Sequence, residues 1–245
     1  MSEITYESAP VTVREDICEA HQRAWKRIAA PGTWWKGRER VDIAAETRNA
    51  FTCNLCRQRK AALSPNAVEG KHESVGDLRE EVVDVIHRVA TDPGRLSKAW
   101  FDKVRASGLE DTRYVEIIGV LVTVVSIDTF CRGIGVPPHP LPEPVEGEPS
   151  RHRPEGAKPE GAWVPMIAHG KEKGPDVDLY QEGRHPNVGR ALSLVPDEVR
   201  GMKDCIGAQY FPFHQVIDVR RKRAISRAQM ELIAGRVSAL NQCFY

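Results

Sequence analysis

The pair Cys53 and Cys56, with two residues between them, is the feature of this sequence best suited to chemistry. Two thiols at this spacing can form a disulfide, bind a metal ion or exchange electrons with a substrate. Arg57, Arg59 and Lys60 follow the pair closely. Their positive charge, together with the dipole of a helix beginning near Cys53, favours the thiolate. Peroxide oxidises a thiolate to a sulfenic acid, which a neighbouring thiol converts to a disulfide, so the pattern indicates redox chemistry.

A redox thiol needs a group that moves protons, and the sequence offers a carboxylate and two histidines. Glu46 lies seven residues before Cys53, which is almost two helical turns. A continuous helix would place both on one face, about 10 Å apart along its axis, so that a histidine or a water has to bridge them. His72 lies in a polar segment, whereas His87 lies at the edge of an apolar face and is either a core histidine or a bridge. We predict that Glu46 and His72 handle the protons.

The same cysteine pair also opens a candidate zinc motif. Fifteen residues separate Cys56 from His72, and fourteen separate His72 from His87. Zinc fingers place their two histidines only three to five residues apart, so the second spacing does not fit a finger. The sequence therefore predicts no bound cofactor, with zinc at Cys53 and Cys56 as the lesser alternative.

Apolar residues recur at helical spacing through most of the chain. Val75, Leu78, Val82, Ile86 and Val89 are three or four positions apart, with charged residues between them, which is typical of a half-buried helix. Similar arguments predict helices over residues 38–51, 96–106, 114–131 and 191–202, and a last one after the capping box that begins at Ser226. We find no convincing pair of strands. The predicted fold class is all-α.

A proline-rich stretch divides the chain. Ten of the 17 prolines lie between residues 137 and 175, and proline removes a backbone donor and blocks the helix. We therefore predict a helical unit at 1–136, a linker or extended arm without regular structure at 137–175, and a second helical unit at 176–245.

Bulk composition excludes several classes of protein. The net charge is +1, which argues against a dedicated nucleic-acid binder, because phosphate recognition needs clustered positive charge. Residues 117–127 form the longest apolar stretch, well below the roughly 20 residues that span a bilayer, and the N-terminus has no apolar signal core. We expect a cytoplasmic protein without a membrane or nucleic-acid partner, in a compartment where thiols stay reduced.

The tail, residues 223–245, resembles the alkylhydroperoxidase D-like, or carboxymuconolactone decarboxylase, family. Redox members carry a glutamate, eleven residues, a Cys-x-x-Cys pair, three residues and a histidine; here Glu231 and Cys243 have the first separation. The sequence stops at Tyr245, so we expect either a fragment or an incomplete copy. Glu116 and Asp128 repeat the frame with aspartate replacing the first cysteine, and we expect that copy to be inert and part of the core.

The resemblance implies an all-helical bundle, a homo-oligomer and reduction of hydroperoxides, regenerated by an unidentified thiol reductant. It also implies that Cys56 attacks the peroxide and that Cys53 resolves the sulfenic acid. Six residues rather than eleven separate Glu46 from Cys53, and Lys60 stands at the position of the family histidine. The predicted catalytic residues are Cys53, Cys56, Glu46, His72, Glu231 and Cys243. The alternatives are a lyase that acts on lactones and a non-catalytic helical module that is zinc-stabilised or oligomerising.

Overall fold

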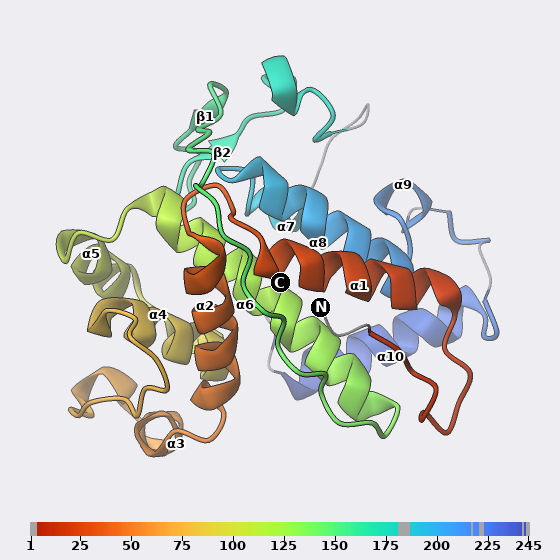
Figure 1. Cartoon of the computed structure of the whole chain (residues 1–245), viewed down its shortest axis with the longest axis horizontal. Helices are drawn as coiled ribbons and strands as arrows, with labels where there is room; N and C mark the ends of the chain where they lie inside the picture. Colours follow the sequence, from red (N-terminus) through yellow and green to blue (C-terminus); the bar gives the residue numbers. More distant parts are fainter. Residues whose placement is uncertain (1–3, 181–186, 217, 221–222, 242, 244–245) are drawn as a thin grey trace.

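Helices make up nearly all of the regular structure, as a computed structural model of the chain shows (Figure 1). The structure describes residues 4–180, 187–216, 218–220, 223–241 and 243. The helices are α1 (Glu15–Ala29), α2 (Gly37–Ala50), α3 (Asn54–Ala61), α4 (Glu80–Thr91), α5 (Lys98–Ala106), α6 (Asp111–Gly133), α7 (Asn187–Arg190), α8 (Pro196–Gln209), α9 (Phe213–Val216) and α10 (Arg227–Leu240), with short 3-10 turns η1 (Pro65–Ala67), η2 (Pro93–Arg95) and η3 (Gly174–Asp176). The prediction of an all-helical fold is confirmed.

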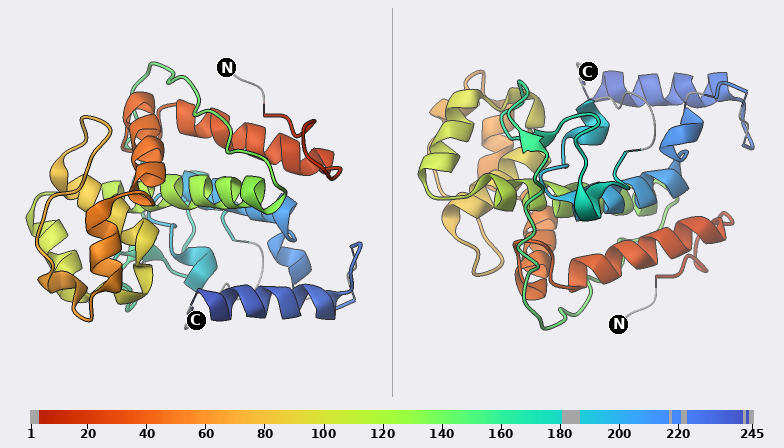
Figure 2. Two further views of the ribbon diagram at one scale, coloured as in Figure 1. Left: turned by 90° about the horizontal axis from the view of Figure 1, so that it is seen from below. Right: turned by 90° about the horizontal axis from the view of Figure 1, so that it is seen from above.

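Helix α6 runs through the centre of the molecule (Figures 1 and 2). It packs against α2 and α4 on one side and against α8 on another, and α1 covers α2 and α8. Ile117, Val120 and Ile127 of α6 are fully buried, so its many β-branched side chains serve the core rather than a strand. By length and composition α6 is apolar enough to cross a bilayer, but 61% of its most apolar window is buried inside the fold.

A buried ionic cluster fixes three of these helices together. Arg40 of α2 forms ion pairs with Glu116 of α6 and, at 2.7 Å, with Glu198 of α8. Two carboxylates share one guanidinium here, and burial together with the charge of Glu198 raises the pKa of Glu116 to about 7. Asp128 is likewise buried and bonded by Arg48 at 2.8 Å. Glu116 and Asp128 are core residues, as the sequence predicted.

The proline-rich segment differs from its prediction. It contains a small antiparallel pair, β1 (Ala157–Lys158) and β2 (Met166–Ile167), so the expectation of no strand pair and no regular structure is wrong. Met166 and Ile167 are buried, and this burial stabilises a pair too short to be recognised by periodicity. Earlier in the arm, before β1, the Val145 amide donates to the Ala29 carbonyl at 2.8 Å. The segment is therefore an arm that packs across the first helices.

Helix boundaries also differ in places. Helix α4 begins at Glu80 rather than near residue 75, and α8 begins at Pro196 rather than at 191. Proline is favoured at the first helical position, which explains the second boundary. The capping box at Ser226 is confirmed at the start of α10, whose described residues include no buried side chain. The division into two units stays a prediction.

Candidate metal centre

The cysteine pair lies where the chain reverses between α2 and α3. Helix α2 ends at Ala50, and Cys53 is the N-cap residue of α3 with an extended backbone. Cys56 therefore occupies the first turn of α3, three positions on, and both side chains point to the same face. The exposed fraction is 0% for Cys53 and 4% for Cys56. Because α2 ends before Cys53, no continuous helix joins Glu46 to Cys53, and the shared helix face inferred from their spacing is wrong.

Two histidines complete the group of side chains. His72 comes from the segment between α3 and α4, and His87 comes from α4. Nδ1 of His72 lies 3.6 Å from the sulfur of Cys53 and 3.6 Å from the sulfur of Cys56. Nδ1 of His87 lies 3.2 Å from the sulfur of Cys56. The four candidate ligand atoms all lie within 4.8 Å of one another.

The buried carboxylate of Glu46 bonds the imidazole of His87 on the side away from the thiols. Nε2 of His87 donates to Oε1 of Glu46 at 2.7 Å, and both side chains are fully buried. Glu46 also accepts hydrogen bonds from three other groups, the amide of Asn49, the hydroxyl of Ser74 and the backbone N–H of Val75. Burial raises the pKa of Glu46, but these hydrogen bonds outweigh it and lower the pKa to about 2. The ionised carboxylate accepts from Nε2–H and so orients the ring with Nδ1 toward the thiols.

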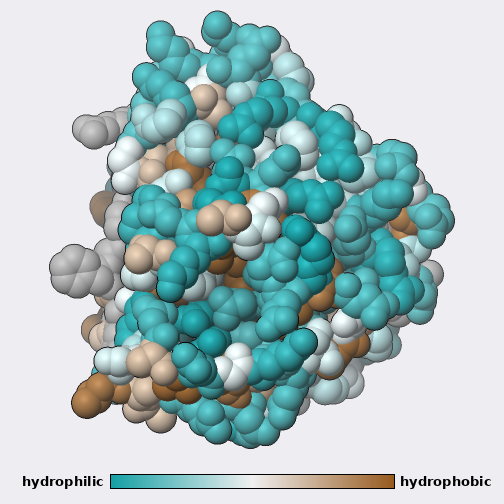
Figure 3. Space-filling model, turned by 90° about the vertical axis from the view of Figure 1, so that its left-hand side faces the viewer, coloured by the Kyte–Doolittle hydropathy of each residue, from teal (hydrophilic) through white to brown (hydrophobic). Residues whose placement is uncertain are grey.

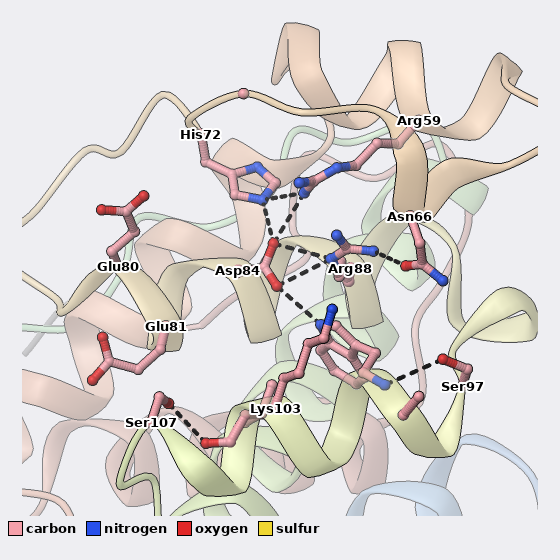
Figure 4. Close-up of a pocket in the computed structure, with 14 residues that line it drawn as sticks. Arg59, Asn66, His72, Glu80, Glu81, Asp84, Arg88, Ser97, Lys103 and Ser107 are labelled. Carbon is pink, nitrogen blue, oxygen red and sulfur yellow. Dashed lines mark hydrogen bonds and ion pairs between the residues drawn. The ribbon is translucent and has the colours of Figure 1, made fainter.

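A second carboxylate holds His72 in the same way (Figure 4). Nε2 of His72 donates to Oδ1 of Asp84 at 3.0 Å. Arg59 Nη1 lies 2.9 Å from both atoms; because an Nε2–H that donates to Asp84 cannot also accept, we assign the Arg59 bond to the carboxylate. Asp84 accepts further bonds from Arg88 and from the indole of Trp100. Burial opposes these bonds, but together they hold the pKa of Asp84 well below its usual range.

The thiols and the imidazoles shift each other's pKa values. Burial raises the pKa of the Cys56 thiol, but His72 and His87 outweigh it and lower the pKa to about 6. Burial lowers the pKa of each imidazole, but hydrogen bonds to the carboxylates and thiols raise the pKa to about 9 at His72 and to about 10 at His87. Without a metal ion, these shifts favour the thiolate of Cys56 and the protonated forms of His72 and His87.

The two distances at His72 fit a tetrahedral ion. Zinc holds a thiolate sulfur at about 2.3 Å and an imidazole nitrogen at about 2.0–2.1 Å, which places the two ligand atoms about 3.6 Å apart in a tetrahedron. The two sulfur–nitrogen distances at His72 match this value, and the distance between His87 and Cys56 is 3.2 Å. Cys53, Cys56, His72 and His87 can therefore hold one small cation.

The structure brings together only part of the predicted catalytic set. Cys53, Cys56 and His72 share the centre, and Glu46 reaches it through His87. The other two residues lie apart on and beyond α10: Glu231 pairs with Arg227 at 2.7 Å, and Cys243 is exposed.

The sequence also predicted that Arg57 and Arg59 hold the thiolate. Arg59 instead bonds Asp84 and Arg57 bonds Asn54, while the sulfurs contact the imidazoles. Asp84 was not recognised as a site residue. Its position three residues before His87 on α4, and so on the same helix face, was the available signal.

Nothing matches this chain in comparisons with models of known families, with curated proteins and with solved structures. The family resemblance of the tail stays a prediction, and function has to be inferred from the geometry of the centre.

Proposed function

We propose that this chain is a zinc-binding helical protein with a structural Cys2His2 centre at Cys53, Cys56, His72 and His87. The observation that carries the proposal is the position of His72 Nδ1, equally far from both sulfurs at 3.6 Å. A histidine that only bonded one thiol would have no reason to be equidistant from two. The carboxylates behind both imidazoles support the same proposal, because metal-bound histidines ordinarily donate their other N–H to such a group.

The ligand chemistry selects zinc among common metals. Two thiolates with two imidazoles suit zinc, whereas calcium and magnesium prefer oxygen ligands. Four protein ligands leave no open position for a water or a substrate, so the ion has a structural role. It would cross-link α3, the segment that carries His72, and α4.

Metal analysis of the purified protein tests the proposal. We expect about one zinc per chain, strongly reduced in Cys56→Ser and in His87→Ala, and unchanged in the control Cys18→Ser, which alters a cysteine outside the centre. A chelator should lower the Tm of the wild type and leave that of the metal-depleted variants unchanged. A protein that is isolated without metal, binds none on addition and ignores the chelator would contradict the proposal.

A second candidate is a thiol-dependent peroxidase, which one specific observation favours. Glu46, His87 and Cys56 form a chain of contacts at 2.7 Å and 3.2 Å, as expected for a base that takes the thiol proton. The Cys56 thiolate would attack a hydroperoxide, releasing an alcohol and leaving a sulfenic acid. The Cys53 thiol would then displace water to form the disulfide, which an external thiol reduces.

The two candidates differ in what the metal does to activity. A peroxidase consumes hydroperoxide catalytically in the metal-free form, and Cys56→Ser abolishes this while Cys18→Ser does not. A structural zinc centre gives no catalytic peroxide consumption that depends on Cys56. Peroxide consumption with excess dithiothreitol, measured before and after zinc loading, separates the two.

A further inference from the structure

A hollow of about 680 Å³ lies beside the centre and has Cys56 in its wall. It is enclosed by the last residues of α2, the outer side of α3, the end of α4 with η2, the second half of α6, and the end of α10. Figure 2 shows the C-terminal end of α10 directed toward the side of the molecule that carries α3 and α4. The volume is within the range of sites for small organic ligands, about 300–1,000 Å³.

The charges of this hollow are unbalanced. Its wall contains Arg57, Lys60, Arg95 and Arg132, against the single carboxylate of Asp92. Asp92 is already paired with Arg95 at 2.6 Å. Within the described residues, Arg57 bonds the neutral side chain of Asn54, and Arg132 bonds the hydroxyl of Thr129. Arg57, Lys60 and Arg132 thus have no carboxylate partner in the described part of the chain.

Part of the remaining wall is apolar, beside the polar residues Thr91, Thr129 and Asn241. Ala50, Phe51, Ala90, Val125 and Leu240 line it, from four different elements. Phe51 is 47% exposed and Leu240 is 64% exposed, although both are large apolar side chains. The face over α3, α4 and α5 is otherwise mostly hydrophilic, with apolar side chains visible in its recesses (Figure 3). An apolar wall beside unpaired cations recognises a molecule with both characters.

We propose that this hollow binds an organic anion with an apolar body, of the chemical class of a medium-chain carboxylate. The carboxylate would lie against Lys60 and Arg132, and the chain would cover Phe51, Val125 and Leu240. Neither a bare anion nor a neutral alcohol satisfies both walls, so both parts of the ligand contribute to affinity. The proposal does not rest on the zinc centre, because none of these residues is a metal ligand.

Isothermal titration with decanoate, below the concentration at which it forms micelles, tests this site in the full-length protein. We expect saturable binding of one decanoate per chain, weakened at least about tenfold in Lys60→Glu/Arg132→Glu and weakened by added salt. Leu240→Ser should also weaken binding, through the apolar wall. The control Lys26→Glu reverses an exposed charge on α1, outside the hollow, and should bind as the wild type does.

Two further probes make the test decisive. Acetate and decanol should each bind much more weakly than decanoate. Equal binding of decanol, or unchanged decanoate affinity in the double charge variant, would overturn the proposal. Zinc content is measured in the same samples: a chain that lacks zinc yet binds decanoate contradicts the metal centre alone, and a zinc-loaded chain that ignores decanoate contradicts the hollow alone.

Discussion

Replacement of Glu46 by glutamine tests whether the carboxylate that is hydrogen-bonded to His87 supports metal binding. The carboxylate accepts four hydrogen bonds, two at each oxygen. Glutamine keeps one acceptor oxygen but turns an NH2 group toward donors at the other position, so at least one buried donor loses its partner. His87 then loses orientation and basicity, and outer partners of this kind contribute about 10–100-fold to metal affinity.

The expected magnitude follows from mass action. At free zinc about 100 times above Kd, binding stabilises the wild-type native state by about 2.7 kcal/mol. A site tenfold weaker gains about 1.4 kcal/mol at the same zinc concentration, and a site a hundredfold weaker gains about 0.4 kcal/mol. The variant therefore loses about 1.3–2.3 kcal/mol of zinc-dependent stability. Since 1 kcal/mol shifts Tm by about 2–4 °C in a chain of this size, the zinc-induced rise in Tm should shrink by about 3–9 °C.

Scanning calorimetry with and without zinc measures this difference within each variant. Any loss of stability that glutamine causes in the metal-free protein cancels, because only the zinc-induced change is compared. Glu80→Gln is the matched control, since the Glu80 side chain is 67% exposed and pairs with Lys71 at the surface. An equal zinc-induced rise in Glu46→Gln and in the wild type would refute the role assigned to the carboxylate.

Three further predictions concern the core. Burial raises the pKa of Glu116 from 4.5 to about 7, so the native state holds a proton that the unfolded chain has released. The free energy of unfolding should therefore fall as the pH rises between these two values. Urea denaturation at a series of pH values should find a smaller fall in Glu116→Gln than in the wild type. An identical fall would contradict the raised pKa of Glu116. Burial lowers the pKa of His21 from 6.5 to about 4, so stability should drop by up to about 3 kcal/mol as pH falls between these values, and His21→Gln should remove most of that pH dependence. Ile127→Ala in the core should cost about 2–5 kcal/mol of unfolding free energy and the exposed Ile233→Ala less than about 0.5 kcal/mol; similar losses at both positions would contradict the packing described.

Much of the fold followed from periodicity. The segment predicted as a core helix at 114–131 lies within α6, and the capping box located the start of α10. Helix α1 was not predicted, although Ile17, Ala24, Trp25 and Ile28 form its buried face. Charged and polar residues between them hid the apolar stripe. The β1–β2 pair was also missed, because four residues are too few to show alternation and their pairing depends on tertiary burial.

The site was predicted only in part, for a geometric reason. Local spacing identified Cys53 and Cys56 and suggested His72. His87 lies beside them because α4 packs against α3 in the tertiary structure. No spacing rule contains that contact, since fourteen residues between two histidines match no finger pattern. Glu231 and Cys243 were singled out by resemblance alone, and the described chain places neither at the centre.

All four candidate ligands fall between residues 53 and 87, and this closeness along the chain bears on the order of folding. Contacts between nearby residues close short loops and form early, whereas the pairing of Arg40 with Glu198 joins positions 158 residues apart. During synthesis, a ribosome would release the whole ligand set long before it made α8. In the nascent chain, the proposed metal ion would then already join α3 to α4, and the later helices would assemble onto this pair.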